Sequence, residues 1–322
     1  MSRKVVLVSG AGGFIGRWSV PQLISRGYEV HAVLGRSAKR GAPTPTQLRG
    51  AEIHCADMLD AESVRAMMAL VKPSHLLHFA WIATPGVYWT SPDNFRWLAA
   101  GQHLLQCFGD QGGTRAVMAG SCAEYDWSRA GVCDERSSPL ADSGSAPLTP
   151  YAECKIAMER ALEGFGNGHA STAWGRIFFQ YGPHEHQDRL VASVIVKLLS
   201  GCEALCTHGR QIRDFLHVAD VGSAFAALLD SDAAGPVNIG SGERISIAQL
   251  LGEIGLQIGR PELVRLGARS APPSEPPLLV PEVRRLSREI GWRPHFNMAD
   301  GMADTIAWWR RELADGDAEA AR

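Results

Sequence analysis

A glycine-rich turn near the start of the chain places the strongest constraint on its fold. The β-branched run Lys4–Ser9 is typical of a buried parallel strand, and glycines follow it at positions 10, 13 and 16. Gly10 allows a sharp turn, Gly13 lets a phosphate approach the backbone, and Gly16 lets a helix pack closely on the strand. The N-terminus of that helix would offer free N–H groups to an anion. This arrangement predicts a dinucleotide cradle, although a plain glycine-rich turn has the same composition.

Strand and helix patterns alternate through the first half of the chain. Further strands are expected at 28–34, 52–55, 75–80, 115–119 and 173–179, and helices at 61–71, 93–108 and 151–165. Such alternation indicates parallel strands with helices on both faces. We therefore predict an α/β fold built on a doubly wound parallel sheet of the Rossmann type.

The pattern changes after about residue 180, where we predict a smaller C-terminal substrate-binding lobe. The dinucleotide-binding domain is expected at 1–178, with 214–240 returning to it, and the lobe at 179–213 and 241–322. Within the lobe we expect helices at 190–199, 248–258 and 300–311, an irregular proline-rich connector at 269–277 and a frayed tail at 315–322. The lobe would close over the carboxyl edge of the sheet, where ligands of such folds bind.

The composition argues against several classes of protein. With 32 basic and 34 acidic residues, the charge balance gives no reason to expect a nucleic-acid or membrane surface. No signal-peptide core and no bilayer-spanning segment are expected, which favours a cytoplasmic location. The seven cysteines are scattered and include no C-x-x-C pair. We therefore expect reduced thiols and no metal site.

The residues after the second expected strand bear on which dinucleotide is bound. NAD sites usually have an acidic residue there that accepts hydrogen bonds from the ribose hydroxyls. This chain has Arg36, Lys39 and Arg40 and no acid in that stretch. Because Arg36 can bind a 2′-phosphate through two hydrogen bonds, NADP(H) is preferred, with NAD(H) and a merely solvated basic loop as alternatives. Asp57 and Met58, after the third strand, are expected to contact the adenine.

Tyr151 and Lys155 lie four residues apart in an expected helix, so they share one face. A free tyrosine has a pKa near ~10 and is a poor acid–base group at neutral pH. An ammonium about 4 Å away would lower that pKa by about three units before desolvation is counted. Ser121 follows the strand that begins at Arg115, where its hydroxyl could polarise a substrate carbonyl. A tyrosine and a lysine also occur at this spacing by chance on helices, and a serine at the start of a loop is often only a local cap.

Short motifs recur in a specific order along nearly the whole chain. They are GAGGFIG (10–16), HFAW (78–81), GSCAEY (120–125), YAECK (151–155), QYGPH (180–184), RDFLHVADV (213–221), VNIGSG (237–242) and GWRP (291–294). Their order resembles that of the extended short-chain dehydrogenases/reductases, in the branch of NAD(P)-dependent nucleotide-sugar epimerases, dehydratases and reductases.

The resemblance implies roles for individual residues. Ser121, Tyr151 and Lys155 would be the catalytic residues, and Lys155 would also hold the nicotinamide ribose. Arg213 would bind the nucleotide diphosphate, although an Arg-Asp pair can also be structural. Cofactor contacts are also expected from Phe14, Ile15, Phe79 and Ala80, and substrate contacts from Cys122, Glu124, Gln180, His184 and Arg213.

Departures from the family pattern narrow the reaction. Similar sugar dehydratases carry adjacent acids after the catalytic serine or threonine, where this chain has Cys122 and Ala123. Dehydration is therefore not expected. The family's asparagine before the Tyr-Gly-Pro turn is replaced here by Phe179-Gln180, and Gln180 could supply an amide from one residue away.

Two groups of side chains are expected near the substrate. His184 matches a histidine of reductases resembling GDP-fucose synthase, and with Glu185 and His186 it could orient a sugar, although a loop histidine is more often exposed. Aromatic residues that could pack on a sugar or base, or simply form core or dimer contacts, are Trp81, Tyr88, Trp89, Phe95 and Trp97.

The sequence therefore favours an NADPH-dependent reductase acting at C4 of a nucleotide-activated 4-keto-6-deoxyhexose. A 4-epimerase with tightly held NAD⁺ is the alternative, and a dinucleotide-sensing regulator without chemistry is a more remote one. The helices at 93–108 and 151–165 resemble those that pair into a four-helix bundle in family dimers. A homodimer is expected on that ground.

Overall fold

The computed structural model describes residues 4–35, 44–129, 131–138, 140–141, 148–168, 170–272 and 274–320, with side chains described as far as residue 315. Within them, the main sheet has seven strands: β1 (Val5–Ser9), β2 (Glu29–Leu34), β3 (Glu52–Cys55), β4 (His75–His78), β5 (Arg115–Ser121), β7 (Ser171–Ile177) and β12 (Gly235–Ile239). The helices around them are α1 (Gly16–Ser25), α2 (Ala61–Val71), α3 (Asp93–Asp110), α4 (Pro150–Gly166) and α6 (Val218–Asp230).

The strand order shows how the sheet creates a binding edge. The strands are parallel and run β3-β2-β1-β4-β5-β7-β12 across the sheet. The direction of winding reverses between β1 and β4, and such a switch point opens a crevice at the carboxyl ends of the strands. The predicted doubly wound Rossmann sheet is confirmed.

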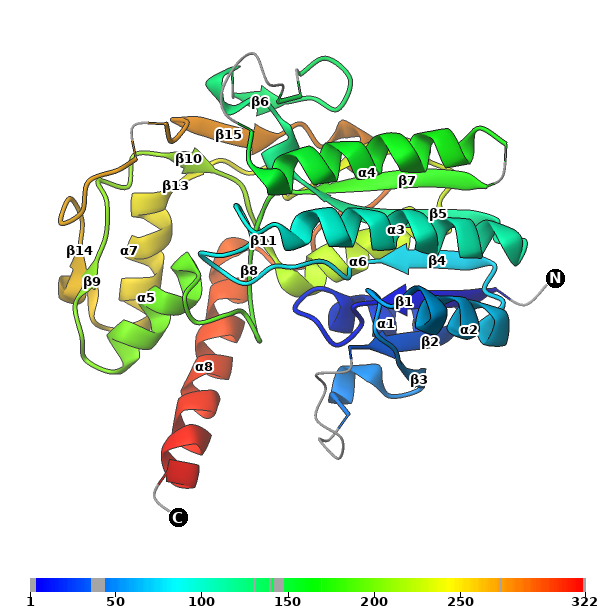
Figure 1. Cartoon of the computed structure of the whole chain (residues 1–322). Helices are drawn as coiled ribbons and strands as arrows, with labels where there is room; N and C mark the ends of the chain where they lie inside the picture. The colour runs from blue at the N-terminus through cyan, green and yellow to red at the C-terminus, as the bar shows by residue number, and fades with distance from the viewer. Residues whose placement is uncertain are drawn as a thin grey trace.

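Helices cover both faces of this sheet, which explains the almost continuous apolar strands. One buried cluster joins α1, α6 and one face of the strands, and a second joins α2, α3 and α4 to the other face. Figure 1 shows α3 and α4 in front of the sheet, with α6 behind it. Both catalytic candidates on α4 therefore start from a rigid element packed on β5 and β7.

A smaller lobe lies beside the carboxyl edge of the sheet, at the left of Figure 1. Its helices α5 (Leu190–Leu199), α7 (Ile247–Ile258) and α8 (Met298–Ala320) pack around their own apolar cluster. Its short strands are β6 (Val132–Cys133), β8 (Phe179–Tyr181), β9 (Ala204–Leu205), β10 (Ile212–Arg213), β11 (Phe215–His217), β13 (Ile245–Ser246), β14 (Val264–Arg265) and β15 (Leu278–Pro281).

Two expected segments differ from the structure. The strand expected at 173–179 is divided: β7 ends at Ile177, and β8 then pairs with β11 outside the main sheet. The tail expected to be frayed from residue 315 instead continues α8 as far as Ala320. The first difference matters for function, because the division turns Phe179 and Gln180 towards the lobe.

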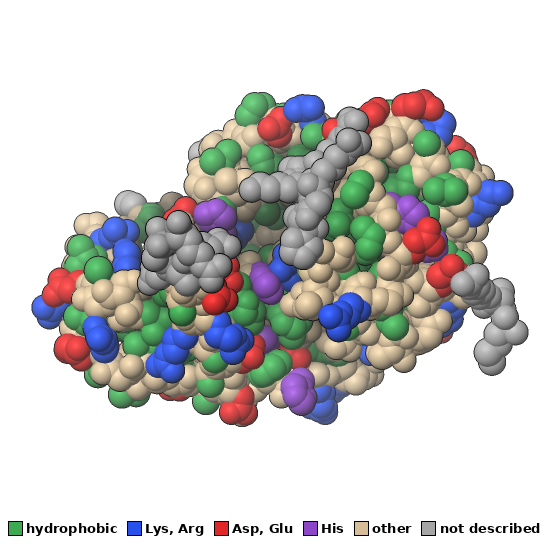
Figure 2. Space-filling model, turned by 90° about the horizontal axis from the view of Figure 1, so that it is seen from below, with side chains coloured by type: hydrophobic (Ala, Val, Ile, Leu, Met, Phe, Trp, Pro, Cys, Tyr) green, Lys and Arg blue, Asp and Glu red, His purple; other side chains and the backbone are tan. Residues whose placement is uncertain are grey.

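Neither positive nor negative charge dominates the face of the molecule seen in Figure 2. Basic and acidic side chains are intermingled there. Among the described residues, none of the helices is both long and apolar enough to cross a membrane.

Candidate active site

The glycine turn between β1 and α1 forms a tight cradle at the switch point. Gly10 has a φ of +68°, and a Cβ built there would lie 2.8 Å from the backbone nitrogen of Ala80. A side chain would therefore clash with the segment after β4. Ile15, the N-cap residue of α1, makes no side-chain capping hydrogen bond, and the first turn contains no acid. The N–H groups of α1 thus suit an anionic ligand.

Arg17 adds a cation to this cradle that the sequence analysis did not single out. Its guanidinium donates to the carbonyl oxygens of Gly12 (2.6 Å) and Gly13 (3.1 Å). Its position directly after Gly16 is the signal that could have indicated it. The turn therefore combines a helix N-terminus with a fixed positive charge, as a pyrophosphate would require.

A cavity of about 420 Å³ opens beside the cradle, between the sheet edge and the lobe. This size is ordinary for a small-molecule site. Expected site residues that line it are Ile15, Phe79, Ser121, Cys122, Tyr151, Lys155, Gln180 and Arg213. The aromatic residues Trp81, Tyr88 and Trp89 line it as well, whereas Phe95 on α3 is exposed. Segments that are far apart in the chain thus converge on one space.

Tyr151 stands in the first turn of α4, at the wall of this cavity. Thr149 caps the helix by accepting from the backbone N–H of Ala152 at 3.2 Å. The Tyr151 ring meets Tyr88 and Trp89 edge-on, with centroids 4.8 Å and 5.5 Å away. The Ser121 side chain lies close enough to its hydroxyl to act on the pKa of the phenol. The aromatic enclosure fixes the phenol against the end of β5.

The expected lowering of the Tyr151 pKa is not found. Burial raises the pKa of Tyr151 well above its ordinary value, and the nearby Ser121 side chain only partly offsets this. Lys155 Nζ lies 5.9 Å from the centroid of the Tyr151 ring. The prediction was wrong because its value was given before desolvation, and desolvation by burial is the largest contribution here. In this structure the phenol keeps its proton.

Lys155 is buried one turn further along α4. Its Nζ donates to the carbonyl oxygen of Ala119 at 2.8 Å and lies 3.9 Å from the centroid of the Trp81 ring. Burial lowers the pKa of Lys155 to about 7, with Glu124 opposing the shift. The amine therefore lies close to a change of charge at neutral pH, and Trp81 favours its charged form.

Ser121 ends β5 and is held by a reciprocal cap. Its hydroxyl accepts from the backbone N–H of Ala123 at 3.2 Å, while its own backbone N–H donates to Glu124 at 2.6 Å. The cap keeps the Ser121 hydroxyl beside that of Tyr151. The next residue, Cys122, lines the cavity with a thiol whose pKa is raised by burial, so it stays neutral.

Glu124 does not contact the cavity, which corrects the expectation that it binds substrate. Its side chain is fully buried and accepts hydrogen bonds from Trp174 (2.8 Å) and Arg176 (2.9 Å), both on β7. Arg176 also pairs with Glu159 of α4 at 2.7 Å. Glu124 therefore ties β5, β7 and α4 together behind the cavity.

Gln180, Glu185 and Arg213 form the wall on the lobe side. The Oε1 of Gln180 and the Oε2 of Glu185 are buried and have no hydrogen-bond partner among the described residues. Burial raises the pKa of Glu185 to about 8. Arg213 pairs with Glu275 at 3.2 Å, so a diphosphate would have to compete with this carboxylate. Unpartnered polar atoms at a cavity wall indicate a polar ligand.

His184 lies outside this cavity, contrary to expectation. Its ring packs against Trp308, with centroids 4.7 Å apart, and its Nε2 lies 3.3 Å from Nε2 of Gln47. The backbone at His184 has a φ of +69°, in the left-handed region. Of the polar group at 184–186, Glu185 reaches the cavity, whereas His186 is about half exposed.

A sequence model described as the NAD dependent epimerase/dehydratase family matches residues 6–240. The chain belongs to this family. The resemblance to extended short-chain dehydrogenases/reductases is thereby confirmed.

Relatives within the family have different activities. The dTDP-4-dehydro-6-deoxy-D-allose reductase of Streptomyces sp is 29% identical, with 95% of this chain and 96% of that protein covered. The UDP-glucose 4-epimerase of Rhizobium meliloti (strain 1021) is 24% identical, with 98% and 100% covered. The solved Thermus thermophilus UDP-glucose 4-epimerase in complex with NAD superposes with a TM-score of 0.77 at 26% identity, over 95% and 99% of the two chains.

The other described residues expected to contact the cofactor lie in the glycine turn, after β4 and after β3. Phe14 is partly buried in the turn and Ala80 packs against Gly10. Asp57 accepts from the backbone N–H of Leu59 at 3.0 Å, and Met58 is buried in the core under α2. Arg36, Lys39 and Arg40 lie outside the described residues.

Proposed function

We propose that this family member is an NADPH-dependent reductase of a nucleotide-activated 4-keto-6-deoxyhexose. The observation that carries the proposal is the convergence of Ser121, Tyr151 and Lys155 on one cavity beside the glycine cradle. Cys122 and Ala123 stand where similar dehydratases have acids, which argues against dehydration. A 4-ketosugar reductase among the relatives supports the same reaction.

The chain's own residues would handle the proton. Reduction adds a hydride, which a bound reduced nicotinamide would supply, and a proton to the ketone oxygen. Tyr151 gives that proton, and the raised pKa of its buried phenol keeps the proton available at neutral pH. Ser121 donates a hydrogen bond to the same oxygen and polarises the carbonyl. The charged form of Lys155 stabilises the phenolate that remains until solvent returns the proton.

The polar wall of the cavity would recognise the sugar nucleotide. Gln180 and Glu185 offer unpartnered polar atoms to the sugar hydroxyls. Arg213 offers its guanidinium to the diphosphate, with release from Glu275 as the cost. Trp89 and Trp127 stand edge to face at 5.7 Å at the cavity wall, where a ring can stack.

We also propose that the protein prefers NADP(H) to NAD(H), because residues 36–40 include cations and no acid. Initial rates with NADPH and NADH compare the two cofactors. Arg36→Ala should raise the KM for NADPH and leave that for NADH unchanged. An equal change for both would remove this residue from the 2′-phosphate site.

A 4-epimerase with tightly bound NAD⁺ is the second candidate. An epimerase of this family covers nearly the same length, and a neighbouring structure holds NAD. A panel of 4-ketosugar and 4-hydroxysugar nucleotides separates the candidates. A reductase consumes NADPH with the 4-keto compounds, whereas an epimerase purifies with NAD⁺ and inverts a 4-hydroxy compound without net cofactor turnover. Failure of both reactions would overturn both.

A cytoplasmic homodimer through α3 and α4 is also proposed. Phe95 at the start of α3 is 54% exposed, and covering it would bury apolar surface. Sedimentation equilibrium should give twice the chain mass, and Phe95→Glu should shift the equilibrium towards monomer.

A further inference from the structure

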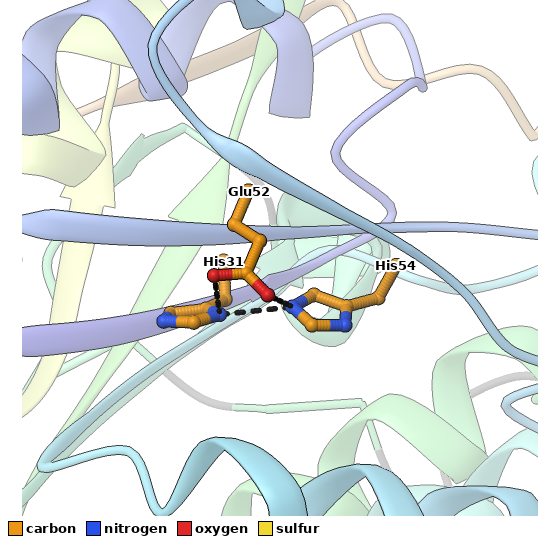
Figure 3. A group of neighbouring side chains, drawn as sticks. All are labelled: His31, Glu52 and His54. Carbon is orange, nitrogen blue, oxygen red and sulfur yellow. Dashed lines mark hydrogen bonds and ion pairs between the residues drawn. The ribbon is translucent and has the colours of Figure 1, made fainter.

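Three potential metal ligands lie together at the outer edge of the sheet, away from the cavity. His31 is on β2, and Glu52 and His54 are on β3 (Figure 3). In the parallel register His31 pairs with Glu52. Because side chains alternate faces every residue along a strand, Glu52 and His54 share a face, and the register puts His31 on it too. The fold therefore brings two imidazoles and a carboxylate together from separate strands.

The distances within this group suit a metal ion. Nδ1 of His31 lies 2.8 Å from Nε2 of His54, and carboxylate oxygens of Glu52 lie 3.7 Å and 3.6 Å from the same two nitrogens. A tetrahedral ion with bonds of about 2.0–2.1 Å needs its ligand atoms about 3.3 Å apart. The three distances lie on both sides of that value, so small side-chain rotations would produce the required triangle.

The ring nitrogen of His31 that faces away from the group also has a partner. Its Nε2 lies 3.5 Å from a carboxylate oxygen of Glu29, on the same strand. A carboxylate behind a histidine orients the ring of a metal ligand and makes the other nitrogen a better donor. Without a metal, one ring of the His31–His54 pair must present N–H to the other, and the ion would replace that proton.

The two histidines of the group are buried or partly buried, which orders them, and the exposed glutamate keeps the group accessible to solvent. His31 is 7% exposed and His54 is partly buried, whereas the Glu52 side chain is 62% exposed. Solvent can therefore deliver an ion and supply a fourth ligand. Two imidazole nitrogens with one oxygen suit zinc better than magnesium or calcium, which prefer oxygen ligands.

We propose that His31, Glu52 and His54 bind one zinc ion that joins the edge strand β3 to β2. The site is structural: none of the three residues lines the cavity, and the ion would hold the strand that leads to Asp57. The absence of a cysteine pair led to an expectation of no metal site. That reasoning missed this group because its members are on different strands.

Calorimetric titration of chelator-treated protein with zinc chloride tests the proposal. One zinc per chain should bind to the wild type. Loss of a ligand in His54→Ala or Glu52→Gln should lower the zinc affinity by at least about ten-fold. Loss of the carboxylate behind His31 in Glu29→Gln should lower it by about ten-fold. Glu62→Gln, which changes an exposed carboxylate on α2 outside this group, is the matched control and should bind as the wild type does. Since Glu52 is largely exposed, Glu52→Gln keeps the test valid if His54→Ala is unstable.

Substitution with cobalt gives an independent readout, because a tetrahedral site with nitrogen and oxygen ligands absorbs visible light. The absorption should appear in the wild type and disappear in His54→Ala. No binding by the wild type would overturn the proposal. Undiminished binding in both ligand variants would also overturn it and would assign the zinc to other donors, such as the exposed thiols of Cys55 and Cys202.

Discussion

The amine of Lys155 lies 3.9 Å from the centroid of the Trp81 ring, while Trp81 is itself held by a hydrogen bond of 2.8 Å to Asn94. A ring face at this distance stabilises the charged form of a lysine by about 1 kcal/mol or somewhat more. It therefore opposes the burial that lowers the pKa of Lys155 to about 7.

Trp81→Leu should lower the pKa of Lys155 further, by roughly one unit. If the charged amine is needed, activity is lost as pH rises through this pKa, so the alkaline limb of the pH–rate profile should move to lower pH. Trp81→Phe keeps an aromatic face and should move it less. Superimposable profiles for the three proteins would show that the ring does not control the charge.

Tyr151→Phe should reduce kcat by about 10²–10⁴-fold, because it removes the proposed proton donor. Dinucleotide affinity, measured by fluorescence titration, should stay within about two-fold of the wild type, a margin of roughly 0.4 kcal/mol. Tyr88→Phe is the matched control, since Tyr88 also lines the cavity and touches the same ring. Comparable losses in both variants would point to packing rather than proton transfer.

Glu185→Gln should change how stability depends on pH. Burial raises the pKa of Glu185 to about 8, with the positive charge of Arg189 opposing. Between an unfolded value near ~4.3 and about 8, the folded protein keeps a proton that the unfolded chain has released. The contribution of Glu185 to the free energy of unfolding is therefore complete below the lower pKa. It falls as the pH rises between the two pKa values and is constant above the higher one.

The neutral Glu185→Gln variant escapes this loss. At pH 8 it should be more stable than the wild type by on the order of a few kcal/mol, and the difference should shrink towards pH 5. Urea denaturation at several pH values measures it, with Glu163→Gln on the exposed side of α4 as control. A difference that does not vary with pH would show that Glu185 is ionised in the folded protein.

Glu124→Gln should destabilise the fold by about 3 kcal/mol, because Arg176 would lose one carboxylate in a buried site. Activity should fall through kcat rather than through the KM for the sugar nucleotide, since Glu124 holds Ser121 and does not reach the cavity. A large rise in KM with unchanged stability would restore the substrate contact that the sequence suggested.

Local patterns explain why much of the site could be predicted from sequence. The spacing of Gly10, Gly13 and Gly16 and the i, i+4 spacing of Tyr151 and Lys155 each act within one turn or one helix. The parallel sheet follows from alternating patterns that the strands and helices carry themselves. These features required no knowledge of distant contacts.

The errors at the candidate active site come from the folded arrangement of the chain. Glu124 is taken out of the cavity by Arg176 and Trp174, about 50 residues later. The raised pKa of Tyr151 comes from an aromatic enclosure that a different loop supplies. The orientation of His184 depends on a left-handed backbone that only the folded loop imposes. Spacing along the chain contains none of this information.

In the proposed reaction, Tyr151 protonates the ketone at C4 of the sugar while a reduced nicotinamide supplies hydride. The test is to incubate the protein with a dTDP-4-keto-6-deoxyhexose and NADPH deuterated at the nicotinamide C4, in the orientation that is transferred. Mass spectrometry should find one deuterium at the sugar C4 with the wild type and almost none with Tyr151→Phe. Deuterium transfer at an undiminished rate in Tyr151→Phe, or a sugar product without deuterium from the wild type, would contradict the account.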